Sequence, residues 1–399
     1  MTEIRHIDLE KPPSLLRGEP TPALVVFWWE ERPVGQVYAT LPREGIETAT
    51  LVERGVGRAA VEAKAPVPGA ERLRTSVVIC TRDRLPALER CLESLRGQTL
   101  APDEIIVVDN GSESGAAVRR ATEAVGGKWI REEVPGLDRA RNVGARAAQG
   151  DVIVYTDDDV MLHRRWLERM VAAFETGIDG VTGLVLPADL ATEAQRLFER
   201  CWGFGRGFVP RDFGPEFFAG ERREACPVWK IGAGASMAFR RRVFERVGFF
   251  DERLDAGAAG CSGDSEMWHR MLTDGMTIRY APAAVAFHEH RREMAALRRQ
   301  IFAYARGHTA ALLVQQERSS GNANGRRAWW GLPRYYLGRA LRRVFGKRRE
   351  ADRFLGEEIK GWASGLAFYY RTRRGRGAPK EGKPRPGRRG AARGAPVSG

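Results

Sequence analysis

The stretch Asp151–Val160, which reads DVIVYTDDDV, decides how the rest of the chain is interpreted. Its first six residues are mostly β-branched and aromatic, which is typical of a buried strand. Asp157, Asp158 and Asp159 follow that strand directly. Adjacent carboxylates repel one another, and a divalent cation that also binds substrate phosphates would hold them together. The alternative is a solvated acidic turn, which the position at the end of a buried strand disfavours.

Strands and helices alternate on the N-terminal side of this stretch. Short β-branched runs predict strands, and apolar residues at helical spacing predict helices. The predicted elements are a strand at Ser76–Cys80, a helix at Leu85–Leu95, a strand at Glu104–Val108, a helix at Ala116–Val125, a strand at Lys128–Arg131 and a helix at Asp138–Ala148. This alternation predicts an α/β fold with a mostly parallel sheet that binds ligands at the carboxyl ends of its strands.

The flanking segments divide the chain into four parts. Residues 1–74 predict a small β extension, with a hairpin of Ala23–Trp29 and Val34–Ala39, followed by a linker rich in Ala, Pro and charge at Val61–Arg74. Residues 75–290 form the predicted catalytic domain, in which Thr182–Phe250 is expected to be irregular. Residues 291–371 predict amphipathic helices, and residues 372–399 a disordered basic tail.

Composition excludes several classes of protein. The chain has 399 residues, of which 43% are hydrophobic, so global disorder is excluded. Its net charge is +14, and the segment Arg371–Gly399 alone carries +9 of it, which leaves +5 for the rest. No stretch reaches the roughly 18 apolar residues of a spanning helix, and the N-terminus lacks the apolar core of a signal peptide. Five scattered cysteines without a CxxC pair indicate a cytoplasmic protein without a disulfide framework or zinc site.

Other polar residues at element ends allow two interpretations each. Asp109 follows the strand EIIVV, where an acid suits a ribose hydroxyl or a base edge, but the Asn-Gly after it equally indicates a turn. Arg139 and Arg141 stand near a helix start that favours anions, although two exposed arginines would look the same.

The segment Gly263–Gly275 predicts a helix that opens on Asp264. An acid there serves as an N-cap or first-turn residue as readily as a catalytic group. Farther on, His288 and His290 are two residues apart, so on a strand they would face opposite sides and would not share a metal. One of them is a candidate ligand, and a surface histidine is the alternative.

The motifs occur in an order that resembles the family 2 glycosyltransferases of the GT-A fold, from Ser76 to about His290. The matching segments are SVVICTRDRLPALERCLESL, DEIIVVDNGS, GLDRARNVGARAAQGDVIVYTDDDV, GAGASMAFRRRVFERVGFFDE and GDSEMWHRM. The resemblance implies a GT-A nucleotide-binding fold with a small N-terminal β extension and a C-terminal helical region. Two positions depart from the family pattern: Arg82-Asp83 stands where many members have Tyr-Asn, and Gly263 stands where many have Glu.

The resemblance also implies roles for matched residues. The implied nucleotide-sugar contacts are Thr81, Arg82, Asp109, Arg141, Asp157 and Asp158. Mn²⁺ or Mg²⁺ would be bound by Asp159, Asp157 and His288, with Asp157 and Asp159 as the two acids of the DxD motif. Asp264 matches the catalytic base, and Glu266 lies near it in sequence.

The implied activity is a metal-dependent, inverting, hexosyltransferase-like transfer of one sugar from a UDP-, GDP- or dTDP-sugar. The acceptor would be a glycan or a lipid-linked molecule of cell-envelope or polysaccharide synthesis. The Gln-x-x-Arg-Trp signature of processive members is absent. A sugar-nucleotide nucleotidyltransferase is the first alternative, but CTRDR (residues 80–84) lacks the glycines of its phosphate loop. An RNA-binding protein with a basic tail is the second, and it would not explain the acids at strand ends; we expect no nucleic-acid partner.

A possible membrane contact lies near the C-terminus. Leu337, Leu341, Val344 and Phe345 share one helical stripe, flanked by arginines. Such a helix suits an anionic membrane surface, which would make the protein peripheral at the inner face of the cell membrane. The alternative is that the stripe packs on the catalytic domain or on a partner subunit.

Overall fold

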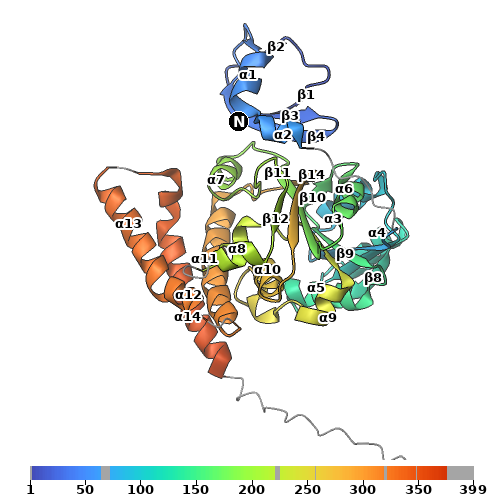
Figure 1. The fold of residues 1–399 in the computed structure, drawn as a ribbon, viewed down its shortest axis with the longest axis vertical. Coiled ribbons are helices and arrows are strands. Elements are labelled where there is room, and N and C mark those ends of the chain that lie inside the picture. Colours follow the sequence, from blue (N-terminus) through green and yellow to red (C-terminus); the bar gives the residue numbers. More distant parts are fainter. Residues whose placement is uncertain are drawn as a thin grey trace, which may run out of the picture.

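The computed structural model describes residues 2–63, 72–220, 225–256, 258–318, 321–346 and 348–374. Three parts follow one another along the chain: a small N-terminal unit, a large α/β domain and a C-terminal group of helices (Figure 1). The α/β domain lies between the other two and contains the predicted site.

The α/β domain is built on a nine-stranded sheet in the order β10-β14-β11-β13-β9-β6-β7-β8, with β12 paired to β14. Six strands run in one direction, and β10, β12 and β13 run against them. The strands are β6 (Thr75–Thr81), β7 (Glu104–Asp109), β8 (Lys128–Arg131), β9 (Val152–Asp157), β10 (Val160–Leu162), β11 (Gly180–Pro187), β12 (Arg211–Phe213), β13 (Ser236–Arg240) and β14 (Ile278–His288). The predicted α/β class and mostly parallel sheet are confirmed.

Helices cover both faces of this sheet. They are α3 (Leu85–Arg96), α4 (Gly115–Glu123), α5 (Leu137–Ala147), α6 (Trp166–Ala172), α9 (Arg241–Val247) and α10 (Gly263–Thr273). Successive residues of β6 enter different cores, since Val78 belongs to one hydrophobic cluster and Val77 and Ile79 to another. Alternate side chains of a strand point to opposite faces, so burial on both sides explains why this strand is apolar throughout.

The segment Thr182–Phe250 is more regular than predicted. It contains most of β11 and all of β12 and β13, together with α7 (Glu193–Trp202), α8 (Pro215–Gly220) and the 3₁₀ turn Val228–Lys230. The expectation of an irregular segment was wrong because its strands are interrupted or preceded by small residues that hide the pattern. Gly232 is one of these, and a Cβ at that position would crowd the Thr182 side chain on β11.

The N-terminal unit contains the predicted hairpin and a further strand. β3 (Pro22–Trp29) pairs antiparallel with β4 (Arg32–Thr40), and β1 (Glu3–Asp8) runs parallel to β3. Its smaller elements are β2 (Leu15–Leu16), β5 (Ile46–Glu47), α1 (Thr48–Gly55) and α2 (Arg58–Glu62). Arg169 of α6 joins the unit to the α/β domain by donating to the carbonyl oxygens of Glu30 and Glu31, at 2.9 and 2.6 Å. Of the predicted linker, residues 64–71 lie outside the described residues.

The C-terminal part is helical. It comprises α11 (Met294–Gln316), α12 (Ala323–Arg326), the π-helical turn Arg327–Gly331, α13 (Leu332–Val344), the 3₁₀ turn Glu350–Phe354 and α14 (Leu355–Arg374). α14 packs on α11 through Gly361 and Gly365, where any Cβ would overlap the α11 backbone. No helix within the described residues is long and apolar enough to cross a membrane. α14 runs to Arg374, and the rest of the predicted tail lies outside the described residues.

Candidate active site

A cavity of about 1760 Å³ opens at the carboxyl ends of the parallel strands. Eight of the ten residues predicted for the site line it: Thr81, Arg82, Arg141, Asp157, Asp158, Asp159, Asp264 and His288. The register explains part of this assembly, because Thr81 pairs with Asp109 and Cys80 with Asp157, so β6, β7 and β9 end at one edge. Asp109 and Glu266 do not line the cavity.

The three consecutive aspartates have different partners. Asp157 Oδ1 lies 3.4 Å from an Arg141 nitrogen, and Asp158 accepts from the Thr81 hydroxyl at 2.8 Å. Arg84 lies between the other carboxylates, 3.1 Å from Asp158 and 2.7 Å from Asp159. Positive charge from arginines therefore offsets part of the repulsion among the three carboxylates. From the sequence alone, we expected a metal ion to offset this repulsion.

The environments of Asp158 and Asp159 move their pKa values apart. Burial, reinforced by the charge of Asp159, raises the pKa of Asp158 to about 6. Burial acts in the same direction on Asp159, but His288, Arg84 and Arg291 outweigh it and lower the pKa of that carboxyl. Asp159 is thus the member of the triplet whose surroundings most favour a carboxylate.

Asp159 and His288 are the pair of side chains that fits a divalent cation. His288 Nε2 lies 3.4 Å from Asp159 Oδ1, and burial lowers the pKa of His288 to about 4, so its imidazole is neutral at pH 7. The described residues contain no group of three or more His, Cys, Asp or Glu side chains arranged to hold a metal. A metal held by Asp159 and His288 would take its other ligands from substrate phosphates and water, which is how Mg²⁺ is commonly bound. Asp157, the third ligand that the resemblance implies, lies 3.4 Å from Arg141.

His288 and His290 contact each other, which corrects the expectation that they face opposite sides. Their Nδ1 atoms are 2.9 Å apart, and His290 Nε2 lies 2.9 Å from Glu199 of α7. The alternation of a strand does not apply because β14 ends at His288. The Glu199 carboxylate can only accept, so His290 Nε2 donates to it, and in the tautomer with that single ring proton His290 Nδ1 accepts from His288 Nδ1. This order leaves the Nε2 lone pair of His288 directed at Asp159, as a metal ligand requires.

Arg141 joins the aspartate triplet to the first turn of α5. Its guanidinium lies 3.2 Å from Asp138 and 3.4 Å from Asp157, and its side chain is buried. Burial, only partly offset by Arg141, raises the pKa of Asp138 to about 7, and the charges of Asp255 and Asp264 add to the effect. Asp138 also lines the cavity. Besides Asp158, it is a second carboxyl with a raised pKa, and it lies close to Asp264.

Asp264 lies in the first turn of α10 and faces the cavity. The N-cap is Ser262, so of the two predicted positions, N-cap and first turn, Asp264 occupies the first turn. Its Oδ2 accepts from the backbone N–H of Gly234 at 2.9 Å, and its Oδ1 accepts from that of Ser265 at 2.6 Å. Both bonds fix the carboxylate while leaving it partly exposed, so it is oriented and accessible.

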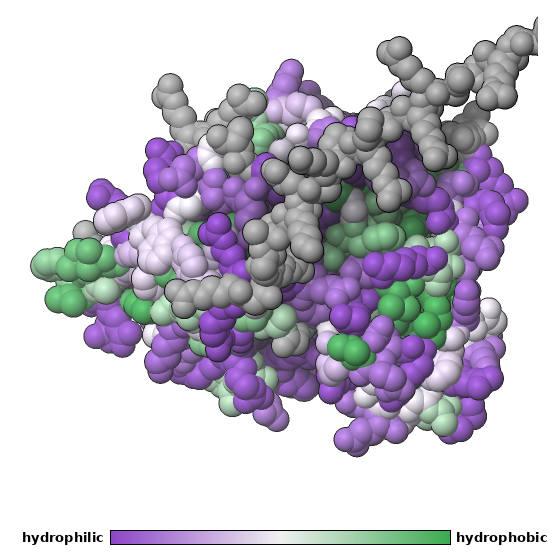
Figure 2. Space-filling view, turned by 90° about the horizontal axis from the view of Figure 1, so that it is seen from below, coloured by the Kyte–Doolittle hydropathy of each residue, from purple (hydrophilic) through white to green (hydrophobic). Residues whose placement is uncertain are grey.

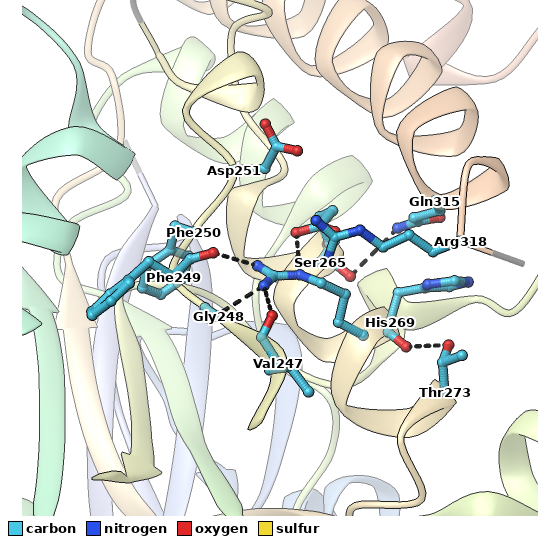
Figure 3. Close-up of polar contacts among 12 residues, drawn as sticks. Val247, Gly248, Phe249, Phe250, Asp251, Ser265, His269, Thr273, Gln315 and Arg318 are labelled. Carbon is cyan, nitrogen blue, oxygen red and sulfur yellow. Dashed lines mark hydrogen bonds and ion pairs between the residues drawn. The ribbon is translucent and has the colours of Figure 1, made fainter. Parts of the chain in front are cut away.

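Glu266 points away from the cavity. Its carboxylate is fully buried and accepts from Arg270 Nε at 2.8 Å, with Arg318 of the C-terminal part 3.8 Å away. Figure 3 shows these surroundings, with Val247, Gly248 and Phe249 on one side and Arg318 and Gln315 on the other. Arg270 also donates to the carbonyl oxygens of all three residues of that loop. The position two residues after Asp264 therefore holds a buried ion pair.

Asp109 is buried beneath the cavity edge. It accepts from the backbone N–H of Ser112 at 2.9 Å and pairs with Arg131 at 2.8 Å. These contacts support the turn interpretation of the segment Asp-Asn-Gly-Ser. The neighbouring Asn110 lines the cavity instead, and its amide holds the loop before α5 by donating to the carbonyl oxygen of Val134 at 2.8 Å.

Sequence reasoning missed Arg84 and Asp138. Both line the cavity, and each contacts a predicted site residue. A signal for Arg84 was available, since it follows a strand end three residues after Thr81, at the same edge as the aspartates. Nothing local distinguishes Asp138 from an ordinary acid in the first turn of a helix.

Residues 76–248 match the family model described as glycosyl transferase family 2. Among curated proteins, the chain is 26% identical over 306 residues to the glycosyltransferase AglE of Haloferax volcanii, covering 73% of this chain and 92% of that protein. It is 28% identical over 188 residues to the glucosyl-dolichyl phosphate glucuronosyltransferase of the same organism, covering 45% of this chain and 56% of that protein.

Two further likenesses extend the comparison. The chain is 28% identical over 240 residues to the pre-mycofactocin glycosyltransferase of Mycobacterium tuberculosis, covering 57% of this chain and 45% of that protein. Among solved structures, the mannosyltransferase PcManGT of Pyrobaculum calidifontis, in complex with GDP-Man and Mn²⁺, superposes with a TM-score of 0.52 at 19% identity. That match covers 77% of this chain and 91% of the mannosyltransferase, and it shows the GT-A fold.

Proposed function

Since this chain is a family 2 glycosyltransferase with a GT-A fold, we propose that it transfers one sugar from a nucleotide-sugar donor to an acceptor hydroxyl with inversion at the anomeric carbon. One observation carries the proposal: a single cavity contains the Asp159–His288 pair, Arg141 and the oriented carboxylate of Asp264. These are the parts that binding a nucleoside diphosphate and accepting a proton require.

The donor is proposed to bind on the side of the aspartate triplet. Thr81 and Arg82 line this side, and Arg84 and Arg141 offer charge-assisted hydrogen bonds to phosphate oxygens. Asp159 and His288 would hold Mn²⁺ or Mg²⁺, which would neutralise charge on the departing nucleoside diphosphate. PcManGT, which shares the fold, was solved in complex with GDP-Man and Mn²⁺, and this supports a divalent cation beside a nucleotide sugar.

Asp264 is proposed as the general base. Its carboxylate is held by the Gly234 N–H at 2.9 Å and faces the cavity, so an acceptor hydroxyl bound there could donate its proton to it. A carboxylate is a weak base for an alcohol, but it suffices when the proton leaves late in a dissociative transition state. Attack from the face opposite the diphosphate accounts for the proposed inversion.

The acceptor is proposed to be a glycan or a lipid-linked molecule of cell-envelope or polysaccharide synthesis. One relative bears the name glucosyl-dolichyl phosphate glucuronosyltransferase, and that name supports the proposal of a lipid-linked acceptor. A peripheral location at the inner face of the cell membrane belongs to the same proposal. The nucleoside of the proposed donor is uridine, guanosine or thymidine.

A donor screen tests the proposed reaction. UDP-, GDP- and dTDP-sugars are incubated with the full chain and Mn²⁺ or Mg²⁺, and the nucleotide product is identified by chromatography. We expect one donor to release its nucleoside diphosphate in a reaction that chelator stops. Release of pyrophosphate from a nucleoside triphosphate and a sugar phosphate would instead indicate the nucleotidyltransferase alternative.

A further inference from the structure

Helix α13 packs on the molecule with the face opposite to its apolar stripe. Its buried residues are Leu332, Tyr336 and Arg339, and Arg339 forms ion pairs with Asp352 and Glu358. The apolar stripe points outward: Leu337 and Leu341 are 60% and 50% exposed, and Val344 and Phe345 are 79% and 77% exposed. The alternative that this stripe packs on the chain's own catalytic domain is therefore wrong.

The outward residues form one continuous surface, here called the α13 surface. Trp330, Arg334, Leu337, Leu341 and Val344 recur at intervals of three or four residues, and Phe345 follows Leu341 by four, so the six share one helix face. Figure 2 shows a hydrophobic projection on the side where Figure 1 places α13. Large exposed apolar patches bordered by charge usually mark an interaction site.

The positive charge around the α13 surface indicates an anionic partner. From Gly321 to Arg349 the sequence contains nine Lys or Arg and no Asp or Glu. Arg334, Arg343 and Arg348 are exposed, and within the described residues no ion pair involves them. A second copy docked face to face would bring arginines against arginines, because an isologous interface repeats the same patch. Anionic lipid headgroups with acyl chains beneath them complement both the charge and the apolar stripe.

We propose that the α13 surface binds an anionic membrane. The cavity supports a consequence for the acceptor, which rests on the proposed function. Asp264 and Asp159 line one part of it, and Leu332, Tyr335 and Tyr336 of α13 line another. A lipid-linked acceptor could thus place its polar head in the cavity while its lipid stays in the bilayer on which α13 lies.

Vesicle sedimentation of the full chain tests the membrane contact. We expect the protein to sediment with vesicles of phosphatidylglycerol and phosphatidylcholine at low salt, to dissociate as salt increases, and not to sediment with pure phosphatidylcholine. The variant Leu341→Asp/Phe345→Asp changes two exposed positions outside the cavity and should weaken binding at least tenfold. Arg334→Glu/Arg343→Glu should do the same and reduce the salt dependence.

Matched variants on other surfaces serve as controls. Leu100→Asp changes an exposed leucine after α3, and Arg58→Glu/Arg120→Glu changes the same net charge on α2 and α4. Both should bind vesicles like the wild type. Equal binding by wild type and α13 variants would overturn the proposal and leave the basic tail as the source of binding. Wild-type protein that ignores anionic vesicles at every salt concentration would also overturn it, as would self-association that the α13 variants abolish.

The donor assay keeps this proposal separate from the proposed function. Donor hydrolysis without vesicles reports on the cavity alone. If the Leu341→Asp/Phe345→Asp variant hydrolyses the donor normally, any loss of sugar transfer with vesicles is due to weaker membrane binding. With vesicles, we expect the wild type to transfer sugar faster to a polyprenyl-phosphate-linked acceptor than to a water-soluble one, and the variant to lose this preference. Vesicle binding without any sugar transfer would refute the activity while the membrane contact stands.

Discussion

The carboxylate of Asp138 fills the space that a side chain at residue 263 would need. A Cβ at Gly263 would overlap both carboxylate oxygens of Asp138, so the first turns of α5 and α10 meet through this contact. Family resemblance leads one to expect a glutamate at position 263. In this chain an acid from a different helix lies there instead, next to the proposed base Asp264.

Asp138 predicts a particular pH dependence of stability. An unfolded aspartate titrates near pH 3.9, whereas burial raises the pKa of Asp138 to about 7 in the folded protein. Between these values the folded state holds a proton that the unfolded state has lost, so the free energy of unfolding falls as pH rises. This contribution is fully present below about pH 4 and is lost by about pH 7.

Asp138→Asn removes that titration while keeping the shape of the side chain. Chemical denaturation at several pH values should show the wild type losing stability relative to the variant as pH rises from about 4 to about 7. Other buried acids titrate in both proteins and cancel in the difference. Parallel profiles for the two proteins would contradict the raised pKa.

Asp264→Asn should separate proton transfer from folding. The amide still accepts a hydrogen bond from Gly234 but cannot take a proton, so we expect near-normal donor binding and a kcat lower by at least about a hundredfold. Asp274→Asn is the matched control, because Asp274 ends the same helix and pairs with Arg246 away from the cavity. A normal rate per folded molecule in Asp264→Asn would reduce this residue to a structural acid.

Glu266→Ala should have the opposite profile. Removing one partner of a buried ion pair leaves Arg270 without its carboxylate, which costs about 3–5 kcal/mol of stability. The rate per folded molecule should stay close to that of the wild type, because Glu266 does not line the cavity. Thermal denaturation and single-turnover assays below the melting temperature measure the two effects. A slow enzyme of normal stability would show that Glu266 acts in the reaction.

Asp159→Ala should abolish sugar transfer and metal-dependent donor binding while the fold remains intact. Without the Asp159 carboxylate, only His288 of the proposed pair would remain to bind the metal. Titration calorimetry with Mn²⁺ and the nucleoside diphosphate measures this loss. Glu289→Ala is the control, since Glu289 is a close neighbour in sequence but pairs with Arg90 at the surface. Full activity of the wild type in chelator would exclude the metal role altogether.

Glu199→Ala tests the hydrogen-bond chain behind His288. Without Glu199 the ring of His290 loses its acceptor, and the orientation and tautomer of His288 are no longer fixed. We expect the apparent Mn²⁺ affinity in the presence of nucleoside diphosphate to fall about 10- to 100-fold, as is usual for residues that orient a metal ligand. Glu193→Ala on the same helix, which breaks a surface pair with Arg353, should leave that affinity unchanged.

Some details of the site were accessible from the sequence but not drawn from it. Asp264 and Glu266 are two residues apart on a helix, and at about 100° per residue they cannot face the same side. Only one of them could line the cavity, as is observed. The two histidines show the reverse case, because His290 lies two residues beyond the end of β14 and the alternation of a strand does not extend to it.

The sequence by itself determined the elements from β6 to β9 and the edge at which the site forms. Runs such as EIIVVD and VIVYTD specify buried parallel strands, and chain continuity then places their terminal acids at one edge of the sheet. These are local effects of side-chain shape and hydrophobicity, so they are visible within a window of a few residues.

Only the tertiary structure decided which charges meet and which faces stay exposed. Arg84 reaches Asp158 and Asp159 across more than 70 residues, and Asp138 reaches Gly263 across 125. The pattern of α13 showed an apolar stripe, but the ion pairs of Arg339 turn that stripe outward. Ion pairing and desolvation depend on distances between distant segments, and those distances exist only once the chain has folded.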